Sequence, residues 1–421
     1  MSEPSEPYTG IRVIEFGQFV AVPFCGQLLA EGGADVIKVE SPAGDPNRHM
    51  GSIAPMESTI FISRNRGKRS LPLKLSDPGA GKVIDALVAS ADVVLMNFRP
   101  GLAEDLGLDP VQLGEKYPRL IIGEITPFGK RGPDADLAGM DIVVQARSGL
   151  MASMGRLIEG RPAPGDPVIS DYMAAMSLAF GIGSALYRRE RTGKGGIVDV
   201  SLMQSAMTLA NNQLIRHEDR DRESHLAANE LLRQQRKDGA SFQAQMEALP
   251  SVREFVLLAV YFRTFETADN TIAVAAVSPG LQVRFMEALG LTDRGLQEKV
   301  DQVYIDELKA EVEATLRAAS SEVWCRRLQQ AGVPVSMVKF PLELFEDAQA
   351  EANNMFDIVE HATAGRLRVL SPPVKLDTDG FKTRSPTAPF GSETRLLLAE
   401  LGMDESAIDD LLAAGISREL D

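Results

Sequence analysis

One uncharged stretch, residues 172–187, constrains the fold more than any other part of the chain. Small residues fill much of it, and no charged side chain divides it into a polar and an apolar face. Such a segment predicts a helix that is apolar on all sides and is therefore buried and closely packed. Arg188, Arg189 and Arg191 follow at the negative end of the helix dipole, and Gly193 is a typical helix terminator.

Asp171 stands directly before this stretch. We expect it in the first turn of the helix, where the dipole is positive and favours the ionised carboxylate. Taken alone, an aspartate at this position is most simply a capping residue. A chemical role for Asp171 therefore needs support from the rest of the chain.

The composition argues against several classes of protein. The 421 residues suggest two or three domains, and 44 Lys and Arg against 59 Asp and Glu give a net charge of −15, which disfavours a nucleic-acid binder. Cys25 and Cys325 are the only cysteines, so the sequence supports neither a disulfide framework nor a thiolate metal cluster. The four histidines are scattered without ligand spacing, so we expect no metal site.

The N-terminal residues 1–7 are polar and acidic, unlike a signal or transit peptide. The uncharged stretch 172–187 is shorter than the ~18 apolar residues of a membrane span, and small residues fill it. We therefore expect a cytoplasmic protein that does not associate with membranes.

Strand-like and helical segments alternate along the first half of the chain. The expected strands are residues 12–16, 34–40, 70–75, 92–97, 120–124 and 197–202, and the expected helices between them include residues 22–31 and 79–90. Strands that are separated by helices indicate an α/β fold. We predict an open, mostly parallel sheet with helices on both faces, similar to a Rossmann-like domain.

The composition changes after the sheet-forming part of the chain. Residues 216–238 are densely charged and are typical of a solvated helix or connector, and residues 255–286 predict the strands and helix of a smaller α+β unit. We expect a large domain from residues 1–212, a small domain with connecting helices from residues 213–338, and a return segment, residues 339–421, that completes the large domain.

Common catalytic motifs are absent, but one stretch reverses the local charge. The sequence has no G-x-G-x-x-G after a strand, no P-loop, no H-E-x-x-H and no G-x-S-x-G. The cations between residues 38 and 74 are Lys38, Arg48, Arg64, Arg66, Lys68, Arg69 and Lys74, and the acidic residues there are Glu40, Asp45 and Glu57. A local net charge of about +4 predicts a site for a small polyanion.

A second candidate feature is the turn at residues 97–101, Asn-Phe-Arg-Pro-Gly, which follows a predicted buried strand. In open parallel sheets, ligands bind at the edge where the strands end. Phe98 could stack on a ring of such a ligand, although an aromatic residue at this place is more often part of the core.

Taken together, these segments match a known family. The matching motifs are R-V-I-E-F at 12–16, G-A-D-V-I-K-V-E at 33–40, G-D at 44–45 with Arg48, G-K-R-S at 67–70, N-F-R-P-G at 97–101, Asp171 with its helix, T-G-K-G at 192–195 and A-P-F-G at 388–391. In order and spacing the chain resembles the family III CoA-transferases, which include formyl-CoA:oxalate and carnitine CoA-transferases and the related α-methylacyl-CoA racemases.

The resemblance implies a coenzyme A site on the N-terminal domain. The positions that match CoA-contacting segments of the family are Val20, Ala21, Ser41, Leu73, Lys74, Leu75, Ser76, Asn97, Phe98 and Arg99. The last matching segment runs from Ala138 to Asp141 and includes Met140. Lys74 and Arg99 should hold the nucleotide end, because each is a cation in or next to the segments described above.

Several departures from the oxalate-specific members are visible. Val20 replaces a glutamine, and Ser41 and Asp105 stand where those members have basic residues. Residues 238–250 contain no glycine-rich loop of the kind that covers the active site in the oxalate branch. The resemblance therefore implies an acceptor acid other than oxalate.

The resemblance also implies a mechanism in which Asp171 is the nucleophile. Its carboxylate would attack an acyl-CoA thioester to give a mixed anhydride, CoA would return to give an aspartyl thioester, and an acceptor carboxylate would reverse the sequence. Apart from CoA itself, which is a substrate, no cofactor is required. The partners are an acyl-CoA donor, a carboxylic acid acceptor and a second copy of the chain in an interlocked homodimer.

Two other functions stay open on the sequence. A 2-methylacyl-CoA racemase needs two opposed acid/base groups. Racemase relatives have Gly-His-Asp where this chain has Gly139-Met140-Asp141, and Met140 cannot exchange a proton. The other possibility is a non-catalytic CoA-binding protein, against which the retention of Asp171 and its flanking pattern argues.

Overall fold

The computed structural model describes residues 6–249, 257–297, 299–376 and 380–420. The chain divides into two compact units, one made of Met1–Met246 with Ala352–Asp421 and the other of Glu247–Glu351. Both boundaries of the second unit come later than those predicted for the small domain, residues 213–338. The charged connector therefore groups with the first unit.

The first unit is built on a six-stranded sheet in which every pairing is parallel. Its strands are β1 (Arg12–Phe16), β2 (Asp35–Glu40), β5 (Lys68–Pro72), β6 (Val93–Met96), β7 (Ile121–Thr126) and β10 (Gly196–Ser201). In the sheet they lie in the order β10-β7-β6-β1-β2-β5. The strand order reverses between β1 and β6, as in a doubly wound α/β fold, and ligands of such folds bind at that point.

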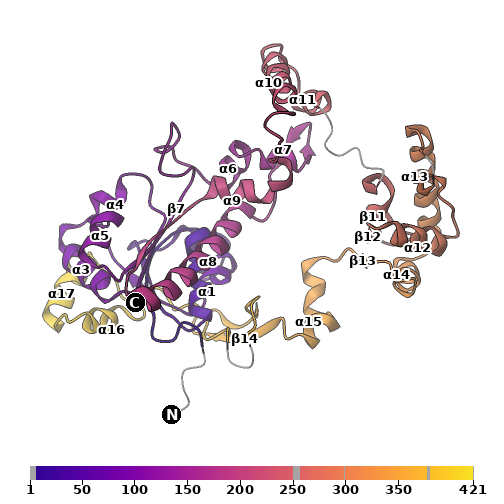
Figure 1. Cartoon of the computed structure of the whole chain (residues 1–421). Coiled ribbons are helices and arrows are strands. Elements are labelled where there is room, and N and C mark those ends of the chain that lie inside the picture. Colours follow the sequence, from indigo (N-terminus) through magenta and orange to yellow (C-terminus); the bar gives the residue numbers. More distant parts are fainter. Residues whose placement is uncertain (1–5, 250–256, 298, 377–379, 421) are drawn as a thin grey trace. The chain divides into compact units, whose positions relative to one another are not determined.

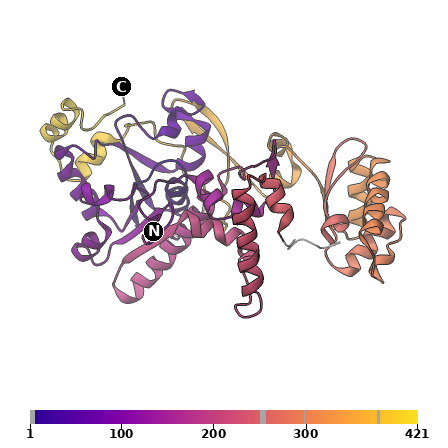
Figure 2. The same cartoon turned by 90° about the horizontal axis from the view of Figure 1, so that it is seen from above.

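Alternate residues of the strands face opposite sides of the sheet. Val13 of β1 belongs to a core with α1 (Ala21–Glu31) and α8 (Ile169–Thr192), whereas its neighbour Ile14 belongs to a core with α3 (Gly81–Ser90), α16 (Thr394–Glu400) and α17 (Glu405–Ala413). Helices therefore cover both faces, as predicted (Figure 1). In Figure 2 the yellow C-terminal helices again lie beside the N-terminal part of the unit.

This part of the chain also contains further helices and two short strand pairs. They are α2 (Thr59–Asn65), α4 (Leu102–Asp105), α5 (Pro110–Lys116), α6 (Asp141–Arg147), α7 (Leu150–Ser153), α9 (Leu202–Leu209), α10 (Arg222–Lys237), α11 (Phe242–Ala248), and the strand pairs β3 (Ser52–Ala54) with β4 (Glu57–Ser58) and β8 (Leu157–Ile158) with β9 (Arg161–Pro162). The six strands expected from the sequence are confirmed. The strand expected at residues 70–75 begins and ends earlier, at Lys68–Pro72.

Helix α8 is buried on one face only, so the prediction of a helix buried on all sides is wrong for the single chain. Its inner face, which includes Ala174, Leu178 and Ile182, packs in the core, but Phe180 is 80% exposed and Tyr187 67% exposed. The sheet and α1 pack against only one side of α8. Length and composition alone would allow α8 to cross a membrane, but the core helix of a globular protein passes the same test.

The return segment closes the first unit from the C-terminal end of the chain. It contributes the hairpin β14 (Phe356–His361) and β15 (Gly365–Leu370) as well as α16 and α17. Leu73 pairs with Ser417 across an isolated bridge, and the Lys74 backbone N–H donates to the Ile416 carbonyl at 2.7 Å. The end of the chain is thus fixed beside the strand end of β5.

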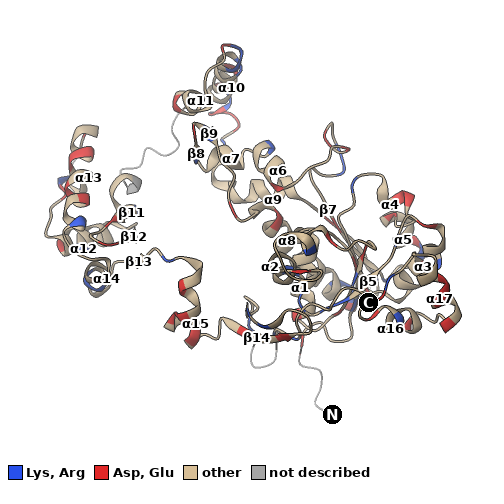
Figure 3. Ribbon diagram, turned by 180° about the vertical axis from the view of Figure 1, so that it is seen from behind, with Lys and Arg blue, Asp and Glu red and all other residues tan. Residues whose placement is uncertain are grey.

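The unit Glu247–Glu351 has its own antiparallel sheet and its own core. The sheet has the order β11 (Phe262–Glu266), β12 (Thr271–Ala275), β13 (Val335–Met337), the helices are α12 (Pro279–Leu289), α13 (Gln302–Arg317) and α14 (Ser321–Gln330), and α15 (Ala348–Ala352) follows. Phe285, Trp324 and Leu328 lie in its core. Residues 255 and 256 of the predicted strand region lie outside the described residues. Acidic residues lie along α13 of this unit (Figure 3).

Candidate active site

A cavity of about 440 Å³ opens at the edge where β1, β2, β5 and β6 end. The described residues that line it are Phe16, Gln18, Phe19, Val39, Ser41, Pro42, Leu73, Lys74, Leu75, Ser76, Asn97, Phe98, Arg99, Leu102 and Leu106. Its position is the point where the strand order reverses. The topology of the sheet therefore places the cavity where ligands of doubly wound folds bind.

The loops around this cavity are held by their own hydrogen bonds. The Asn97 side chain accepts from the Gln18 backbone N–H and donates to the Gln18 carbonyl, both at 3.0 Å, so it ties the turn after β6 to the loop after β1. Phe19 has a positive φ of 67°, and its carbonyl accepts from the Asn47 side chain at 2.6 Å. These bonds fix a strained loop directly before α1.

Eight of the predicted CoA-contacting positions line this cavity, namely Ser41, Leu73, Lys74, Leu75, Ser76, Asn97, Phe98 and Arg99. Val20, Ala21 and the segment 138–141 do not line it. Val20 and Ala21 are buried at the start of α1, next to the lining residue Phe19, while Ala138 and Met140 lie on the exposed approach to α6. The turn at residues 97–101 thus has the position at the sheet edge that the sequence indicated.

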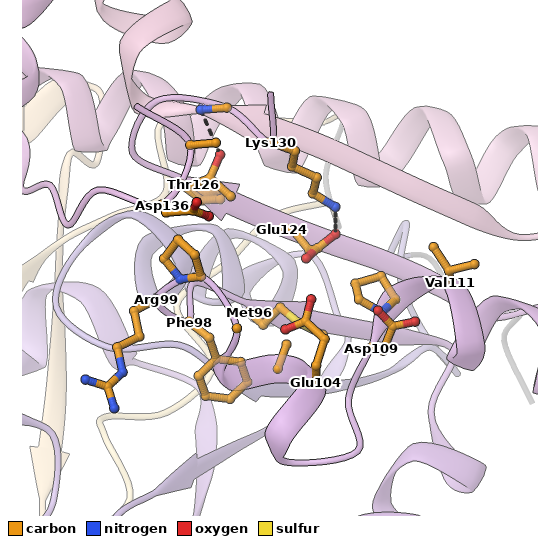
Figure 4. Close-up of a pocket in the computed structure, with 17 residues that line it drawn as sticks. Met96, Phe98, Arg99, Glu104, Asp109, Val111, Glu124, Thr126, Lys130 and Asp136 are labelled. Atoms are coloured by element: carbon orange, nitrogen blue, oxygen red, sulfur yellow. Dashed lines mark hydrogen bonds and ion pairs between the residues drawn. The ribbon is translucent and has the colours of Figure 1, made fainter. Parts of the chain in front are cut away.

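The charge of the cavity differs from that of its neighbour. Lys74 and Arg99 supply cations, and none of the described residues that line the cavity is acidic. A second cavity of about 330 Å³ shares Phe98 and Arg99, but its lining carries the carboxylates of Glu104, Asp109, Glu124 and Asp136. In Figure 4 the Arg99 guanidinium points away from the ion pair that Lys130 forms with Glu124. A polyanion therefore fits the first cavity better than the second.

Most of the basic stretch between residues 38 and 74 is occupied inside the protein, so the polyanion site predicted from it is wrong for those residues. Lys38 and Lys68 both pair with the fully buried Glu15, at 3.0 and 2.7 Å. Arg48 pairs with Glu40 and Glu57, each at 2.7 Å. A sum of charges along the sequence does not reveal these pairs, because their acidic partners lie both inside and outside the stretch.

The same holds for Arg66 and Arg69, which pair with Glu31 and Glu400, each at 2.8 Å. Lys74 remains 53% exposed and forms only a rim contact with Asp77, at 3.2 Å. Lys74 is therefore one of the few cations of the stretch that can reach a ligand.

Asp171 is the third residue of α8, and it does not cap the helix. The cap comes from a distant residue, because Asp141 of α6 accepts from the backbone N–H of Ser170 at 2.8 Å and of Asp171 at 3.3 Å. Gln145 donates to Asp141 and brackets Gly165, accepting from its N–H at 2.8 Å and donating to its carbonyl at 3.1 Å. Asp141 and Gln145 thus position the start of α8.

The environment of Asp171 disfavours its charge, so the expectation that the helix favours the ionised form is wrong. Burial, followed by repulsion from Asp141, raises the pKa of Asp171 to about 7, and attraction by Arg64 opposes this rise. Burial is the larger cause. The cap adds to it, because the first N–H groups of α8 bind the Asp141 carboxylate and bring its charge close to Asp171.

Sequence reasoning missed the contacts that Tyr172, the residue after Asp171, makes with Arg64 and Phe24. Arg64 of α2 donates to the Tyr172 hydroxyl at 3.2 Å, and the Tyr172 ring meets the Phe24 ring edge to face at 4.9 Å. Tyr172 therefore joins α8 to α1 and α2, and it holds a cation close to Asp171. In the sequence Arg64 contributes only to the local sum of charges, and no local pattern links it to a residue more than a hundred positions away.

Comparison with known proteins agrees with these features. Residues 8–394 match the model of CoA-transferase family III. The chain belongs to this family. It is 29% identical over 427 residues to cinnamoyl-CoA:phenyllactate CoA-transferase of Clostridium sporogenes, covering 98% of this chain and 97% of the relative. It is 30% identical over 395 residues to acetyl-CoA:oxalate CoA-transferase of Acetobacter aceti, covering 92% and 94%.

Solved structures of similar proteins share the fold. The orthorhombic form of Rv3272 from Mycobacterium tuberculosis has a TM-score of 0.75 at 28% identity and covers 94% of this chain and 100% of that one. A CAIB/BAIF family protein from Brucella suis has a TM-score of 0.74 at 27% identity, covering 94% and 99%. These CoA-transferase comparisons support an α/β enzyme fold across nearly the whole chain.

The raised pKa of Asp171 predicts a pH-dependent cost to the fold of this CoA-transferase. Its pKa is about 7 in the folded protein against an ordinary value of 3.8, so folding loses stability as the pH rises between these values. Asp171→Asn removes the titration and should be more stable than the wild type at pH 8 by about 1–2 kcal/mol, after allowance for partial exposure, with little difference at pH 4. Urea unfolding at pH 4 and at pH 8 measures these differences in the free energy of unfolding.

The exposed Asp238 gives the control, because Asp238→Asn changes the same atoms on the surface. A difference between Asp171→Asn and the wild type that stays constant or shrinks from pH 4 to pH 8 would contradict the assignment.

Proposed function

We propose that this family III enzyme moves CoA from an acyl-CoA donor to a free carboxylic acid by covalent catalysis at Asp171. The observation that carries the proposal is a half-buried carboxylate that is not used as a helix cap, at the start of a helix fixed by Asp141. Its raised pKa suits a nucleophile, since a more basic carboxylate attacks more readily once it is ionised.

In the first half-reaction an Asp171 carboxylate oxygen attacks the thioester carbonyl carbon of the donor. The new C–O bond gives a mixed anhydride, and the C–S bond breaks to release CoA as thiolate. The thiolate then attacks the aspartyl carbonyl, which forms an aspartyl–CoA thioester and releases the donor acid as carboxylate. Each step exchanges one acyl bond for another, so no metal or redox cofactor enters.

In the second half-reaction the acceptor carboxylate attacks the aspartyl thioester and releases CoA thiolate again. The thiolate attacks the acceptor's carbonyl in the new anhydride, forms the product acyl-CoA and restores the Asp171 carboxylate. Arg64 is well placed to assist both halves, because it lowers the repulsion between Asp171 and an approaching acid.

The cavity of about 440 Å³ at the end of β1 and β6 is the proposed CoA site. Lys74 and Arg99 lie at its rim as cations for the phosphates, and Phe98, which packs against Phe16 at 6.1 Å between ring centroids, presents an aromatic surface to the cavity. Val20 and Ala21 would contribute backbone groups of the loop before α1. Ala138 and Met140 belong to the proposed site through their closeness in sequence to Asp141.

The residues also bear on the class of carboxylic acid that supplies the acyl group of the donor or serves as the acceptor. The relatives include enzymes named for cinnamoyl, phenyllactate and oxalate groups, so the family takes acids of very different polarity. Val20 and Ser41 are uncharged where the oxalate-specific pattern places polar or basic groups. The segment 238–250 is expected to lack the glycine-rich loop of the oxalate branch. Within it, Phe242–Ala248 form α11, and Pro250 lies outside the described residues. We propose an acid that is larger and less polar than oxalate.

The two other functions gain nothing from the geometry. Met140 occupies the racemase position and is 56% exposed at the start of α6, with no proton to exchange. A non-catalytic CoA binder would not require a carboxylate whose charge is disfavoured beside Asp141. In the described residues no group of three or more His, Cys, Asp or Glu side chains is arranged to hold a metal ion.

An isotope exchange tests the proposal without knowledge of the acceptor. Isotope-labelled free CoA should enter unlabelled acyl-CoA when only the enzyme and one donor are present, because the first anhydride forms reversibly. Exchange should increase as the pH rises through about 7, as Asp171 loses its proton. In Asp171→Ala and Asp171→Asn the rate of this exchange should fall about 10³-fold or more, since no neighbouring group replaces the nucleophile.

Hydroxylamine should release the trapped acyl-enzyme and mark the peptide that contains Asp171. Exchange that persists in Asp171→Ala, or a label found on Glu159 or Asp166, would refute the mechanism.

The CoA site has its own test. Lys74→Ala and Arg99→Ala should each raise the dissociation constant of CoA about tenfold in calorimetry, the loss of one charge-assisted contact at a solvent-exposed rim. Lys116→Ala is the matched control, because Lys116 is similarly exposed and also contacts one aspartate, at 3.4 Å. Equal affinities for all three variants would remove this cavity from consideration.

We further propose the interlocked homodimer that the family resemblance implies, in the cytoplasm. Met176, Phe180 and Tyr187 form an exposed apolar stripe on α8, at helical spacing. A stripe of this kind is typical of a protein interface. Phe180→Asp should shift sedimentation toward the monomer, whereas Leu396→Asp, which changes an exposed leucine on α16, should not. Wild-type monomers at nanomolar concentration would count against the dimer.

A further inference from the structure

Arg64 of α2 differs from the buried arginines of the basic stretch, because no ion pair neutralises it. Arg48 and Arg66 are buried, and each pairs with a glutamate, at 2.7 and 2.8 Å. Arg64 is only half-buried, and it forms no ion pair with a carboxylate of the described residues. Its charge is therefore accessible to a ligand.

One hydrogen bond orients the Arg64 side chain and leaves an edge of its guanidinium free. Nε donates to the Tyr172 hydroxyl at 3.2 Å, and the central carbon lies 5.6 Å from the centre of the Tyr172 ring. Within the part of the chain that the structure describes, neither Nη1 nor Nη2 forms a hydrogen bond. The N–H donors of these two groups are spaced to match the oxygens of a carboxylate.

Tyr172, which orients Arg64, is itself held in place. It follows Asp171 in α8, and its ring meets the Phe24 ring edge to face at 4.9 Å between centroids. The Tyr172 hydroxyl accepts a hydrogen bond from Arg64 and still has its own proton to donate. Arg64 and Tyr172 therefore offer donors to one carboxylate from two fixed side chains.

The charges around Asp171 place Arg64 close to the proposed nucleophile. Burial and then the Asp141 carboxylate raise the pKa of Asp171, and Arg64 acts in the opposite direction. The N–H groups of Ser170 and Asp171 at the start of α8 already bind Asp141, so they are not free to hold an approaching acid. The attraction for such an acid therefore has to come from a side chain, and Arg64 supplies it.

Acylation of Asp171 in the proposed mechanism would change the attraction of Arg64 for an anion. While Asp171 is ionised, its negative charge partly compensates the guanidinium and repels a second carboxylate. In the aspartyl–CoA thioester the same side chain is neutral, so the positive charge of Arg64 is no longer compensated. This is the state that the acceptor acid has to attack.

We propose that Arg64 binds the reacting carboxylate of the acceptor acid, and that it does so once Asp171 carries CoA. The inference rests on the proposed function, because it takes the aspartyl–CoA thioester as the form that the acid meets. One carboxylate oxygen attacks the aspartyl carbonyl carbon with a lone pair that the guanidinium does not use. The C–O bond of the anhydride forms, the C–S bond breaks, and CoA leaves as thiolate.

The binding of free acids to Asp171→Asn tests this order without turnover, because the amide is neutral like the acylated side chain and does not react. The probes are butyrate and succinate, which have equal chain lengths and differ by a second carboxylate. At pH 8, where the pKa of about 7 leaves wild-type Asp171 mostly ionised, both should bind Asp171→Asn about tenfold more tightly than the wild type. Ligand-observed NMR titration measures the dissociation constants.

The role of Arg64 is measured in the same Asp171→Asn background. Adding Arg64→Met, which keeps the length of the side chain and removes its charge, should raise both dissociation constants about 10- to 100-fold, the effect of one charge-assisted contact. Arg64→Lys should lose less, because the charge remains and only the fork is lost. Tyr172→Phe should raise the constants about threefold, since the hydroxyl that orients Arg64 is missing.

Arg263→Met is the matched control. Arg263 is also half-buried, and its guanidinium lies over an aromatic ring, that of Phe265, at 5.2 Å from the ring centre. This change removes the same charge elsewhere in the chain and should leave both dissociation constants unchanged.

In the reacting enzyme, Arg64→Met should separate two exchange reactions. Labelled butyrate enters butyryl-CoA only if a free acid binds, whereas labelled CoA enters it without one. The exchange of the acid should therefore fall at least about tenfold further than the exchange of CoA. Succinyl-CoA with labelled succinate should give the same result.

The outcomes separate this inference from the proposed function. If neither donor supports exchange that depends on Asp171, the proposed function fails. If exchange depends on Asp171 but the acids bind Asp171→Asn equally well with and without Arg64, only the inference fails. Equal affinities of the wild type and Asp171→Asn would exclude the proposed order. A loss confined to succinate would assign Arg64 to the far carboxylate and would also overturn the inference.

Discussion

The arrangement of the sheet depends on ion pairs that are buried in its centre. Glu15 of β1, Lys38 of β2 and Lys68 of β5 are at most 5% exposed, and the Glu15 carboxylate lies within 3.0 Å of both amino groups. Their desolvation is costly, and the loss of one partner would leave a buried charge without compensation, typically about 3–5 kcal/mol. The three adjacent strands are therefore held in one register by charge as well as by apolar packing.

The same interactions bring distant segments to the site. Arg48 joins Glu40 at the end of β2 to Glu57, and burial raises the pKa of Glu57 to about 7. Thr387 of the return segment donates to Glu57 at 3.1 Å. The end of the chain is thus tied to the strand ends around the cavity. Because the inner cations have partners, only rim residues such as Lys74 are left for an anionic ligand.

The sequence predicted the sheet well because burial on both faces leaves a clear mark, a run of apolar residues between helical segments. It could not predict the partners of its charges or caps. Asp141 lies 29 and 30 positions before the two N–H groups that it binds, and Arg64 lies more than a hundred before Tyr172, so only the fold brings these residues together. The exposed face of α8 was missed for a related reason. An apolar composition does not show which side of a helix the same chain covers.

The raised pKa of Asp171, which burial and then the Asp141 carboxylate cause, has a chemical consequence. A buried carboxylate without its own hydrogen-bond donors is destabilised relative to water. In the anhydride and the thioester of the proposed mechanism the same side chain is neutral, so burial would no longer penalise it. The environment therefore disfavours the free carboxylate more than the acylated forms. Destabilising the carboxylate lowers the activation free energy of its attack on the thioester. Arg64 limits this effect, since enough of the anion must remain near neutral pH for attack to begin.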